Sequence, residues 1–214
     1  MNKTKIEWCD YTWNPITGCL NGCPYCYARK IAMRFTGHFN PALHVDRLGE
    51  PAKLRKQSII FADSMSDFWG RGVKQEWRNS VYEAMKQAPQ HKFILLTKQP
   101  QNIRDAKKIP ENVWVGVSVT TFGDRWRIAT LLTKIQKRIL VSLEPLLTDN
   151  ISSYVFTVNW VIVGALTGQK GFRPKDSTVR RIINECVRLD IPMFVKDNVG
   201  FGKTYQLFPE GLKS

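Results

Sequence analysis

Acidic residues are scarce in this chain of 214 residues. It has 18 Asp and Glu against 32 Lys and Arg, which gives a formal net charge of +14 at pH 7. In a small protein, a positive surplus of this size commonly accompanies a polyanionic partner, and nucleic acid is the usual one. The cations are spread along the sequence, so a second interpretation stays open, in which they only keep the protein soluble.

Long apolar runs are missing as well. No stretch of about 18 apolar residues occurs, so the sequence predicts no transmembrane helix and no membrane partner. Residues 1–8 lack the apolar centre of a signal peptide. The five cysteines are an odd number and three of them are clustered, which argues against a secreted disulfide framework. These absences predict a cytoplasmic protein.

Three closely spaced cysteines are what the chain does have. Cys19, Cys23 and Cys26 are separated by three and then two residues. Thiolates are the preferred protein ligands of iron–sulfur clusters, and three of them can hold three irons of a [4Fe–4S] cube. The fourth iron then stays open, as a catalytic metal position must. A zinc site or three buried thiols are the alternatives, but no second Cys or His pair at zinc spacing exists.

Short apolar runs alternate with helical patterns along the chain. Seven stretches are predicted strands: residues 11–19, 58–62, 93–97, 113–119, 138–143, 160–165 and 192–195. Predicted helices occupy 27–35, 74–86, 100–107, 125–132 and a segment from 176 onward. This alternation is typical of βαβ units in a parallel sheet. A complete eightfold barrel needs about 250 residues. We therefore expect a single α/β domain over residues 1–214, an open, partial (β/α)6-type TIM barrel, with a doubly wound sheet as the runner-up.

The cysteine spacing resembles the signature of the radical S-adenosylmethionine (SAM) enzymes, in which an aromatic residue precedes the last cysteine, as Tyr25 does in this sequence. The resemblance implies that Cys19, Cys23 and Cys26 ligate a [4Fe–4S] cluster whose open iron binds SAM, with Tyr25 near the adenine. An electron from the cluster then cleaves SAM to methionine and a 5′-deoxyadenosyl radical. An electron donor such as a flavodoxin or ferredoxin is implied with it.

Polar residues follow several predicted strands, at the ends where parallel β/α folds place their chemistry. Radical SAM cores use polar or acidic residues after the second strand to contact the SAM amino group, and Asp63, Ser64 and Ser66 hold this place. A plain Asp/Ser turn is the alternative. Ser118 and Thr120, after the fourth strand, are candidates for the ribose or carboxylate of SAM, although helix-capping residues would look the same.

The later strand ends supply the remaining candidates. Glu144 is expected to bind SAM or substrate or to relay a proton, and Lys196 is the second catalytic candidate. The alternative for Glu144 is a structural ion pair with Lys98 or Lys196. In radical SAM cores the region of Gly164 packs on the adenine. Arg173, further along the same loop, is a candidate for the SAM carboxylate or a substrate phosphate.

Several stretches are similar to one branch of that superfamily, the phage Gp37/Gp68-like or three-Cys-motif proteins. They are residues 6–8, 12–19, 64–67, 143–146 and 161–174. The chain departs from the branch in two ways. Only three residues separate its first two cysteines, where the branch has a longer insert, and residues 165–168 replace a Gly-Glu-Ser-Gly motif. Spore photoproduct lyase, a more distant relative that acts on DNA, shares the three-cysteine spacing.

The expected function is that of a radical SAM enzyme acting on nucleic acid, in DNA lesion repair or nucleotide modification. A target base would be flipped toward the cluster, and exposed aromatic side chains would stack on bases. One alternative is radical SAM modification of a peptide or small metabolite. Another is a non-enzymatic iron–sulfur or zinc module that binds nucleic acid. That module needs a fourth protein ligand, for which Cys9 is the only nearby candidate.

Overall fold

The computed structural model describes residues 1–149, 158–166 and 173–213. The chain forms two compact units, which comprise residues 1–114 and 115–214. None of the helices within the described ranges is long and apolar enough to cross a membrane.

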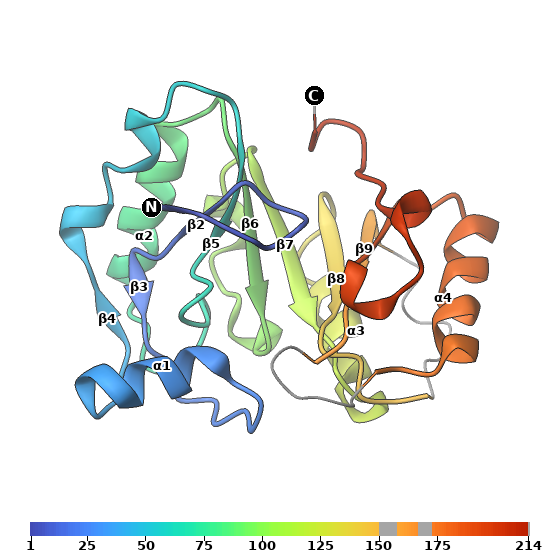
Figure 1. Cartoon of the computed structure of the whole chain (residues 1–214). Coiled ribbons are helices and arrows are strands. Elements are labelled where there is room, and N and C mark those ends of the chain that lie inside the picture. The colour runs from blue at the N-terminus through green and yellow to red at the C-terminus, as the bar shows by residue number, and fades with distance from the viewer. Residues whose placement is uncertain (150–157, 167–172, 214) are drawn as a thin grey trace. The chain divides into compact units, whose positions relative to one another are not determined.

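The first unit contains a sheet segment with the strand order β1-β2-β5-β6 (Figure 1). β1 (Asn2–Lys3) pairs antiparallel with β2 (Tyr11–Trp13). β2 pairs parallel with β5 (Ile59–Ala62), and β5 pairs parallel with β6 (Lys92–Thr97). The carboxyl ends of these three parallel strands therefore lie at one edge, where the candidate residues after β5 were expected.

Two helices and a small ribbon complete the first unit. β3 (Ile16–Thr17) and β4 (Ala42–Leu43) form an antiparallel pair. α1 (Tyr27–Thr36) follows the cysteine loop. α2 (Gln75–Lys86) makes the crossover that parallel strands require between β5 and β6. Val81, Ala84 and Met85 of α2 are buried at helical spacing. The ring of Tyr82, on the same helix, is also buried and packs edge to face against Phe68.

The second unit has the strand order β7-β8-β9-β10, and all three pairings are parallel. The strands are β7 (Val113–Ser118), β8 (Ile139–Leu143), β9 (Trp160–Val163) and β10 (Met193–Val195). Every residue of the four strands is buried. Continuous apolar runs predict this pattern, because both faces of such strands are covered.

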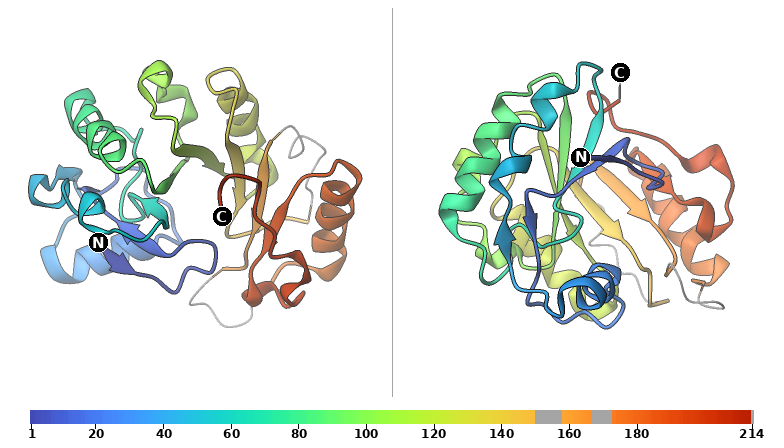
Figure 2. Two further views of the ribbon diagram at one scale, coloured as in Figure 1. Left: turned by 90° about the horizontal axis from the view of Figure 1, so that it is seen from above. Right: turned by 60° about the vertical axis from the view of Figure 1, so that its left-hand side comes forward.

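The helices of the second unit follow its strands. α3 (Trp126–Leu132) comes after β7, and α4 (Asp176–Arg188) lies alongside β9 and β10 in both views of Figure 2. α4 buries one stripe of residues at three- and four-residue spacing, including Val179, Ile182 and Cys186, and keeps its charged residues outside.

The prediction of an α/β fold with parallel strands is confirmed, and each of the seven predicted strands overlaps one parallel strand of the structure. The segment at 100–107 differs from its prediction. It forms two short 3₁₀ turns, Pro100–Asn102 and Ala106–Lys108, in place of one helix. β1 was not predicted, because a strand of two residues leaves no periodic pattern to detect.

A buried ion pair anchors α2 in the first unit. The Arg78 Nε atom lies 2.9 Å from Asp105 Oδ2, and both side chains are at most one-tenth exposed. Trp69 Nε1 and Gln75 Nε2 also donate to this carboxylate, at 3.0 and 2.9 Å. Burial alone would raise the pKa of Asp105, but the hydrogen bonds and the Arg78 charge outweigh it and lower the pKa.

We expect Asp105→Ala to lower the free energy of unfolding by about 3–5 kcal/mol, because it leaves the Arg78 charge buried without its partner. Urea unfolding followed by circular dichroism measures this. Since the folded-state pKa of Asp105 is lowered, its contribution is present above the unfolded value of about 3.9 and is lost as the pH falls below it. Glu83→Ala, which removes the exposed Glu83–Lys86 pair, is the control and should cost less than about 1 kcal/mol. Equal losses in the two variants would contradict the prediction.

Candidate functional site

The three clustered cysteines lie in the loop that precedes α1. Each is half-buried, and none forms a disulfide. Two backbone amides donate to their sulfur atoms: Asn21 N to Cys19 Sγ at 3.4 Å, and Arg29 N to Cys26 Sγ at 3.3 Å. Hydrogen bonds to sulfur are one of the means by which proteins tune iron–sulfur clusters. The loop therefore offers soft ligands together with donors directed at them.

The path of this loop is set at both ends. Gly18 has a φ of +88°, and a Cβ there would collide with the backbone carbonyl of Asn40, so the position requires glycine. The Gly18 amide donates to the Met65 carbonyl at 2.9 Å, which holds the start of the loop against the segment after β5. At the other end Cys26 is the N-cap of α1, since its sulfur accepts from the third residue of the helix.

The donor set fits a sulfur-ligated cluster, because three thiols and two amide donors to sulfur lie in one loop. Within the described ranges, no three His, Cys, Asp or Glu side chains form a group that could hold a metal ion. Burial raises the pKa of Cys19 to about 11, so this thiol must lose its proton when it binds a metal. Metal binding at Cys19 would therefore release a proton.

Cys9 does not share this location. It is 8% exposed and immediately precedes Asp10. Asp10 exchanges hydrogen bonds with the first residue of β5, since Asp10 N donates to Ile59 O and Ile59 N donates to Asp10 Oδ2. Cys9 therefore lies near the amino end of β5, whereas the cysteine loop meets the segment beyond its carboxyl end. A fourth ligand at Cys9 stays a prediction of the metal-module alternative.

Asp63 and Ser66, two of the predicted SAM contacts, carry buried polar atoms without partners. Asp63 Oδ1 accepts from Ile16 N at 3.0 Å, whereas Asp63 Oδ2 and Ser66 Oγ have no hydrogen-bond partner among the described residues. Burial raises the pKa of Asp63 well above its ordinary range, and the nearby Asp67 charge adds to this against the Ile16 amide. Unsatisfied buried polar atoms are rare. Among the described residues of this unit, Tyr82 Oη and His91 Nδ1 are also unsatisfied. Asp63 and Ser66, however, belong to the segment that meets the cysteine loop, so they are the candidates to receive a polar ligand.

Ser64 serves the structure of the same segment. Its hydroxyl donates to Asn14 Oδ1 at 3.1 Å, and the Tyr27 hydroxyl donates to its carbonyl at 2.9 Å. The ring of Tyr25, the aromatic residue before the last cysteine, lies 5.8 Å from Lys98 Nζ. Lys98 follows β6, so the aromatic residue and the carboxyl end of that strand are neighbours.

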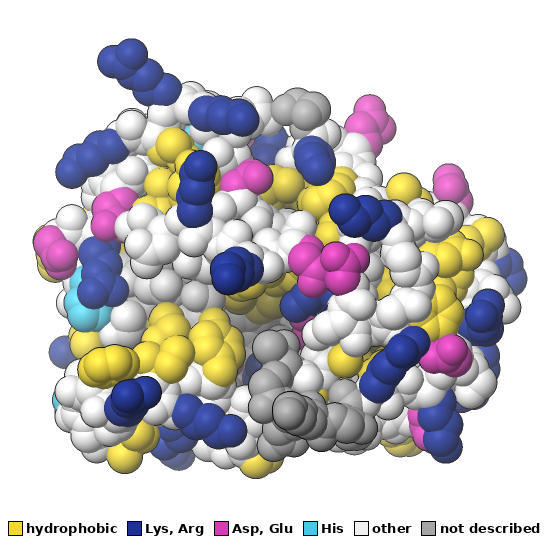
Figure 3. All heavy atoms as spheres, in the orientation of Figure 1, with side chains coloured by type: hydrophobic (Ala, Val, Ile, Leu, Met, Phe, Trp, Pro, Cys, Tyr) yellow, Lys and Arg dark blue, Asp and Glu magenta, His cyan; other side chains and the backbone are white. Residues whose placement is uncertain are grey.

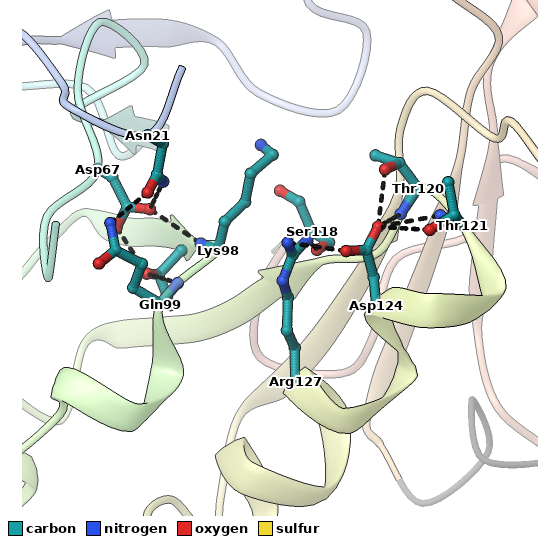
Figure 4. A network of polar contacts seen from close by, with 10 residues as sticks. Asn21, Asp67, Lys98, Gln99, Ser118, Thr120, Thr121, Asp124 and Arg127 are labelled. Carbon is teal, nitrogen blue, oxygen red and sulfur yellow. Dashed lines mark hydrogen bonds and ion pairs between the residues drawn. The ribbon is translucent and has the colours of Figure 1, made fainter. Parts of the chain in front are cut away.

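Asp67 joins the cysteine loop to the ends of β5 and β6 (Figure 4). Its carboxylate accepts from Thr97 Oγ1 at 2.6 Å, from the Lys98 amide at 2.9 Å and from Asn21 Nδ2 at 3.0 Å. Gln99 Nε2 in turn donates to Asn21 Oδ1. Sequence reasoning did not assign Asp67 to the site. Its position after a strand and the similarity of residues 64–67 to the three-Cys-motif branch were the available signals. Its hydrogen-bond partners could not be predicted, because they are distant in the chain.

The two predicted catalytic residues, Glu144 and Lys196, form an ion pair in the second unit. Lys196 Nζ lies 2.8 Å from Glu144 Oε1, and both side chains are less than one-fifth exposed. Ser142 Oγ donates to Glu144 Oε2 at 3.4 Å. A Cβ on Gly164 would lie 2.6 Å from Glu144 Oε1, so glycine makes room for this side chain. The structure thus brings together Glu144, Gly164 and Lys196 from the ends of β8, β9 and β10. The ion pair of Glu144 with Lys196, which was the alternative interpretation of Glu144, is present.

Ser118 and Thr120 take part in a network around Asp124 (Figure 4). Asp124 Oδ2 accepts from the Thr120 hydroxyl at 2.8 Å and from the Thr121 amide at 3.0 Å. Arg127 pairs with Asp124 Oδ1 at 2.8 Å and donates to the Ser118 carbonyl at 2.9 Å. Burial would raise the pKa of Asp124, but the Thr120 hydrogen bonds and the Arg127 charge outweigh it and lower the pKa. The capping residue of this turn is the neighbouring Thr121, and Thr120 supports the cap by donating to the same carboxylate.

Arg173 lies on the surface before α4. Its Nη2 atom is 3.2 Å from Asp176 Oδ1, and both side chains are more than half exposed. A Cβ on Gly200 would lie 2.6 Å from the same Nη2 atom, so the guanidinium packs against this glycine. Residues 167–172 of the loop between Gly164 and Arg173 lie outside the described residues.

We expect Gly164→Ala to lower the free energy of unfolding by about 1–3 kcal/mol, because the new methyl group overlaps the Glu144 side chain. In a Glu144→Ala background the same change should cost much less, since the overlap is gone. A double-mutant cycle of denaturant unfolding measures this coupling. Gly49→Ala is the matched control, because no atom lies within 4 Å of its added Cβ. Additive effects of the two substitutions would show that the close approach of Gly164 and Glu144 is not energetically important.

These observations define an α/β protein with parallel strands, a three-cysteine loop before its first helix and polar networks after the strands. The chain belongs to a family of proteins of unknown function, DUF5131, which matches residues 3–208. No curated protein matches the chain.

Solved structures of spore photoproduct lyase share this fold. The complex with dinucleoside spore photoproduct has a TM-score of 0.60 at 11% identity and covers 91% of this chain and 78% of the lyase chain. A single-substitution variant has a TM-score of 0.62 at 10% identity with the same coverage. A double variant with bound AdoMet and dinucleoside spore photoproduct has a TM-score of 0.57 at 11% identity and covers 86% of this chain and 62% of the lyase chain. At these identities the likeness establishes the fold.

Proposed function

We propose that this protein is a radical SAM enzyme built on an open, partial (β/α)6-type barrel. The observation that carries the proposal is the position of the cysteine loop. The spacing of Cys19, Cys23 and Cys26 resembles the radical SAM signature, and the loop precedes the first helix of a fold shared with a lyase that binds AdoMet. When bound to a [4Fe–4S] cluster, SAM supplies a 5′-deoxyadenosyl radical that abstracts hydrogen or adds to a double bond.

In the first unit the side chains around the loop would hold and orient the cofactors. The amides of Asn21 and Arg29 donate to thiol sulfurs and remain in place to stabilise them as thiolates. Asp63 Oδ2 and Ser66 Oγ, which lack partners within the described part of the chain, would accept from the SAM amino group. Tyr25 offers an aromatic face for the adenine.

In the second unit the residues at the strand ends carry the remaining proposed roles. The Glu144–Lys196 pair, largely shielded from water, holds a proton donor and a carboxylate 2.8 Å apart and is suited to move a proton near the reacting atoms. Gly164 leaves backbone accessible for close approach of an adenine, and Ser118 and Thr120 lie at the end of β7. Arg173 would meet the SAM carboxylate or a substrate phosphate.

Nucleic acid is the proposed substrate, in DNA lesion repair or nucleotide modification. The net charge of +14 favours it, and two of the similar lyase structures contain dinucleoside spore photoproduct. Figure 3 shows Lys and Arg side chains distributed over the visible face, with fewer Asp and Glu among them. The proposal includes a flavodoxin or ferredoxin as electron donor, a cytoplasmic location and the three-Cys-motif branch of the superfamily. A peptide or small metabolite remains the alternative substrate.

A non-enzymatic metal module is the second candidate function. Its closed site needs four protein ligands, and the nearest additional thiol in the sequence, Cys9, lies near the opposite end of β5. This placement favours the enzyme.

The test is anaerobic formation of 5′-deoxyadenosine. Protein reconstituted with iron and sulfide is reduced with dithionite and given SAM, and the product is quantified by chromatography and mass spectrometry. We expect product from the wild type and a loss of at least a hundredfold in Cys23→Ala, because a cluster with two cysteine ligands is not retained. Cys186→Ala is the matched control. This buried cysteine belongs to α4, so its loss should leave iron content and product within about twofold.

Full iron occupancy without product, and without any SAM-induced change in the electron spin resonance spectrum of the reduced cluster, would overturn the enzyme proposal. Loss of iron in Cys9→Ala would instead identify a closed site with four protein ligands and favour the binding module.

A further inference from the structure

A surface turn after β7 exposes two aromatic rings. Phe122 is 36% exposed and Trp126, four residues later at the start of α3, is 44% exposed. The sequence could not sort the tryptophans into core and surface. In the structure Trp69 and Trp114 are buried, and Trp126 is the tryptophan among the large exposed apolar residues of the described ranges.

Arginines accompany both rings. The Arg125 guanidinium carbon lies 3.8 Å from the centroid of the Phe122 ring, which is the shortest of the cation–aromatic contacts within the described ranges. The Arg127 guanidinium carbon lies 5.8 Å from the Trp126 centroid. Within the described part of the chain, Arg125 makes no hydrogen bond or ion pair, so its N–H groups remain available to an anion. Stacked guanidinium and aromatic planes with free donors suit a partner that has both flat rings and phosphates.

The turn is held in place before any partner arrives. Its acidic residue, Asp124, accepts from the hydroxyls and amides of Thr120 and Thr121 and pairs with Arg127. The carboxylate is therefore compensated, and the net charge of segment 122–127 is positive. Because the backbone is fixed by this capping box, binding loses little conformational entropy on the protein side.

We propose that Phe122, Arg125 and Trp126 form a stacking platform for an unpaired base of a nucleic acid, with Arg125 at the adjoining phosphate. The platform is defined by these three residues. The inference rests on the proposed function for its choice of nucleic acid, and it identifies which surface of the second unit would contact the strand. Aromatic stacking tolerates any base, so the platform would bind single-stranded segments with little sequence preference.

The test is fluorescence anisotropy of a dye-labelled single-stranded 12-nucleotide DNA, titrated with the reconstituted full-length protein without SAM at several salt concentrations. We expect Trp126→Ala to weaken binding about tenfold, because a base–aromatic stack is lost. The salt dependence should stay unchanged, since no charge is removed. Trp126→Phe, which keeps an aromatic face, should lie within about threefold of wild type.

Arg125 provides the complementary readout. Arg125→Ala removes one phosphate contact and should reduce the slope of log Kd against log salt concentration by about 0.7. Arg125→Lys should restore the slope but not the full affinity, because lysine keeps the charge and loses the flat guanidinium.

Phe35→Ala is the matched control. Phe35 is 77% exposed and lies 5.9 Å from the guanidinium carbon of Arg34, so it is a second exposed aromatic residue with its own arginine. It should bind the oligonucleotide within about twofold of wild type. Circular dichroism and the urea midpoint of each variant establish that it is folded.

The outcomes separate the platform from the enzyme. Unchanged DNA affinity in Trp126→Ala, or an equal loss of affinity in Phe35→Ala, would overturn the platform. Unchanged affinity in Trp126→Ala would indicate that the exposed rings bind a protein partner. Formation of 5′-deoxyadenosine by the wild type, measured in the same preparation without DNA, tests the proposed function independently. If the wild type forms no 5′-deoxyadenosine but Trp126→Ala still weakens DNA binding, the platform is supported and the enzyme proposal is rejected.

Discussion

The carboxylate of Asp67 is the interaction on which the first unit's site depends. This side chain, which is 5% exposed, accepts from the cysteine loop, from the last residue of β6 and from the residue that follows it. Hydrogen bonds to a buried charge are stronger than neutral ones, and removing their acceptor leaves the donors unsatisfied, at about 1–3 kcal/mol each. The loop is therefore attached to the strands that were expected to present the cofactor.

The second unit uses the same chemistry at its own strand ends. Asp124 accepts from threonine hydroxyls and backbone amides just as Asp67 accepts from Thr97 and Lys98. In each case an aspartate side chain accepts hydrogen bonds from backbone amides and threonine hydroxyls at the end of a strand, where the sheet offers them no partner. The polar residues that follow strands in this chain thus divide into those that organise the edge and those, such as Asp63 and Ser66, whose atoms lack partners among the described residues. A polar ligand would gain the most binding free energy at the second group, because it would satisfy buried atoms that have no partner among the described residues.

The sequence predicted the parallel strands well, because buried strands require continuous apolar runs that are visible in the chain itself. It also located the cysteine loop, since cluster ligands are close in sequence. Contacts between distant residues were not predictable. Asn21 and Gln99, which share a hydrogen bond, are 78 positions apart, and the close approach of Gly164 to the Glu144 side chain depends on strand register. Likewise, the exposure of Trp126 is decided by how α3 packs, which composition does not reveal.

Cys26 connects the cofactor chemistry to the folding of the chain. Its sulfur marks where α1 begins, because it accepts the Arg29 amide, and the same atom is a proposed iron ligand. Serine is among the best residues at a helix start but a poor ligand for iron. Replacing Cys26 by serine would therefore preserve the start of α1 and weaken metal binding. Related sequences with serine at this position would therefore be expected to keep the fold and to lack the proposed cluster chemistry.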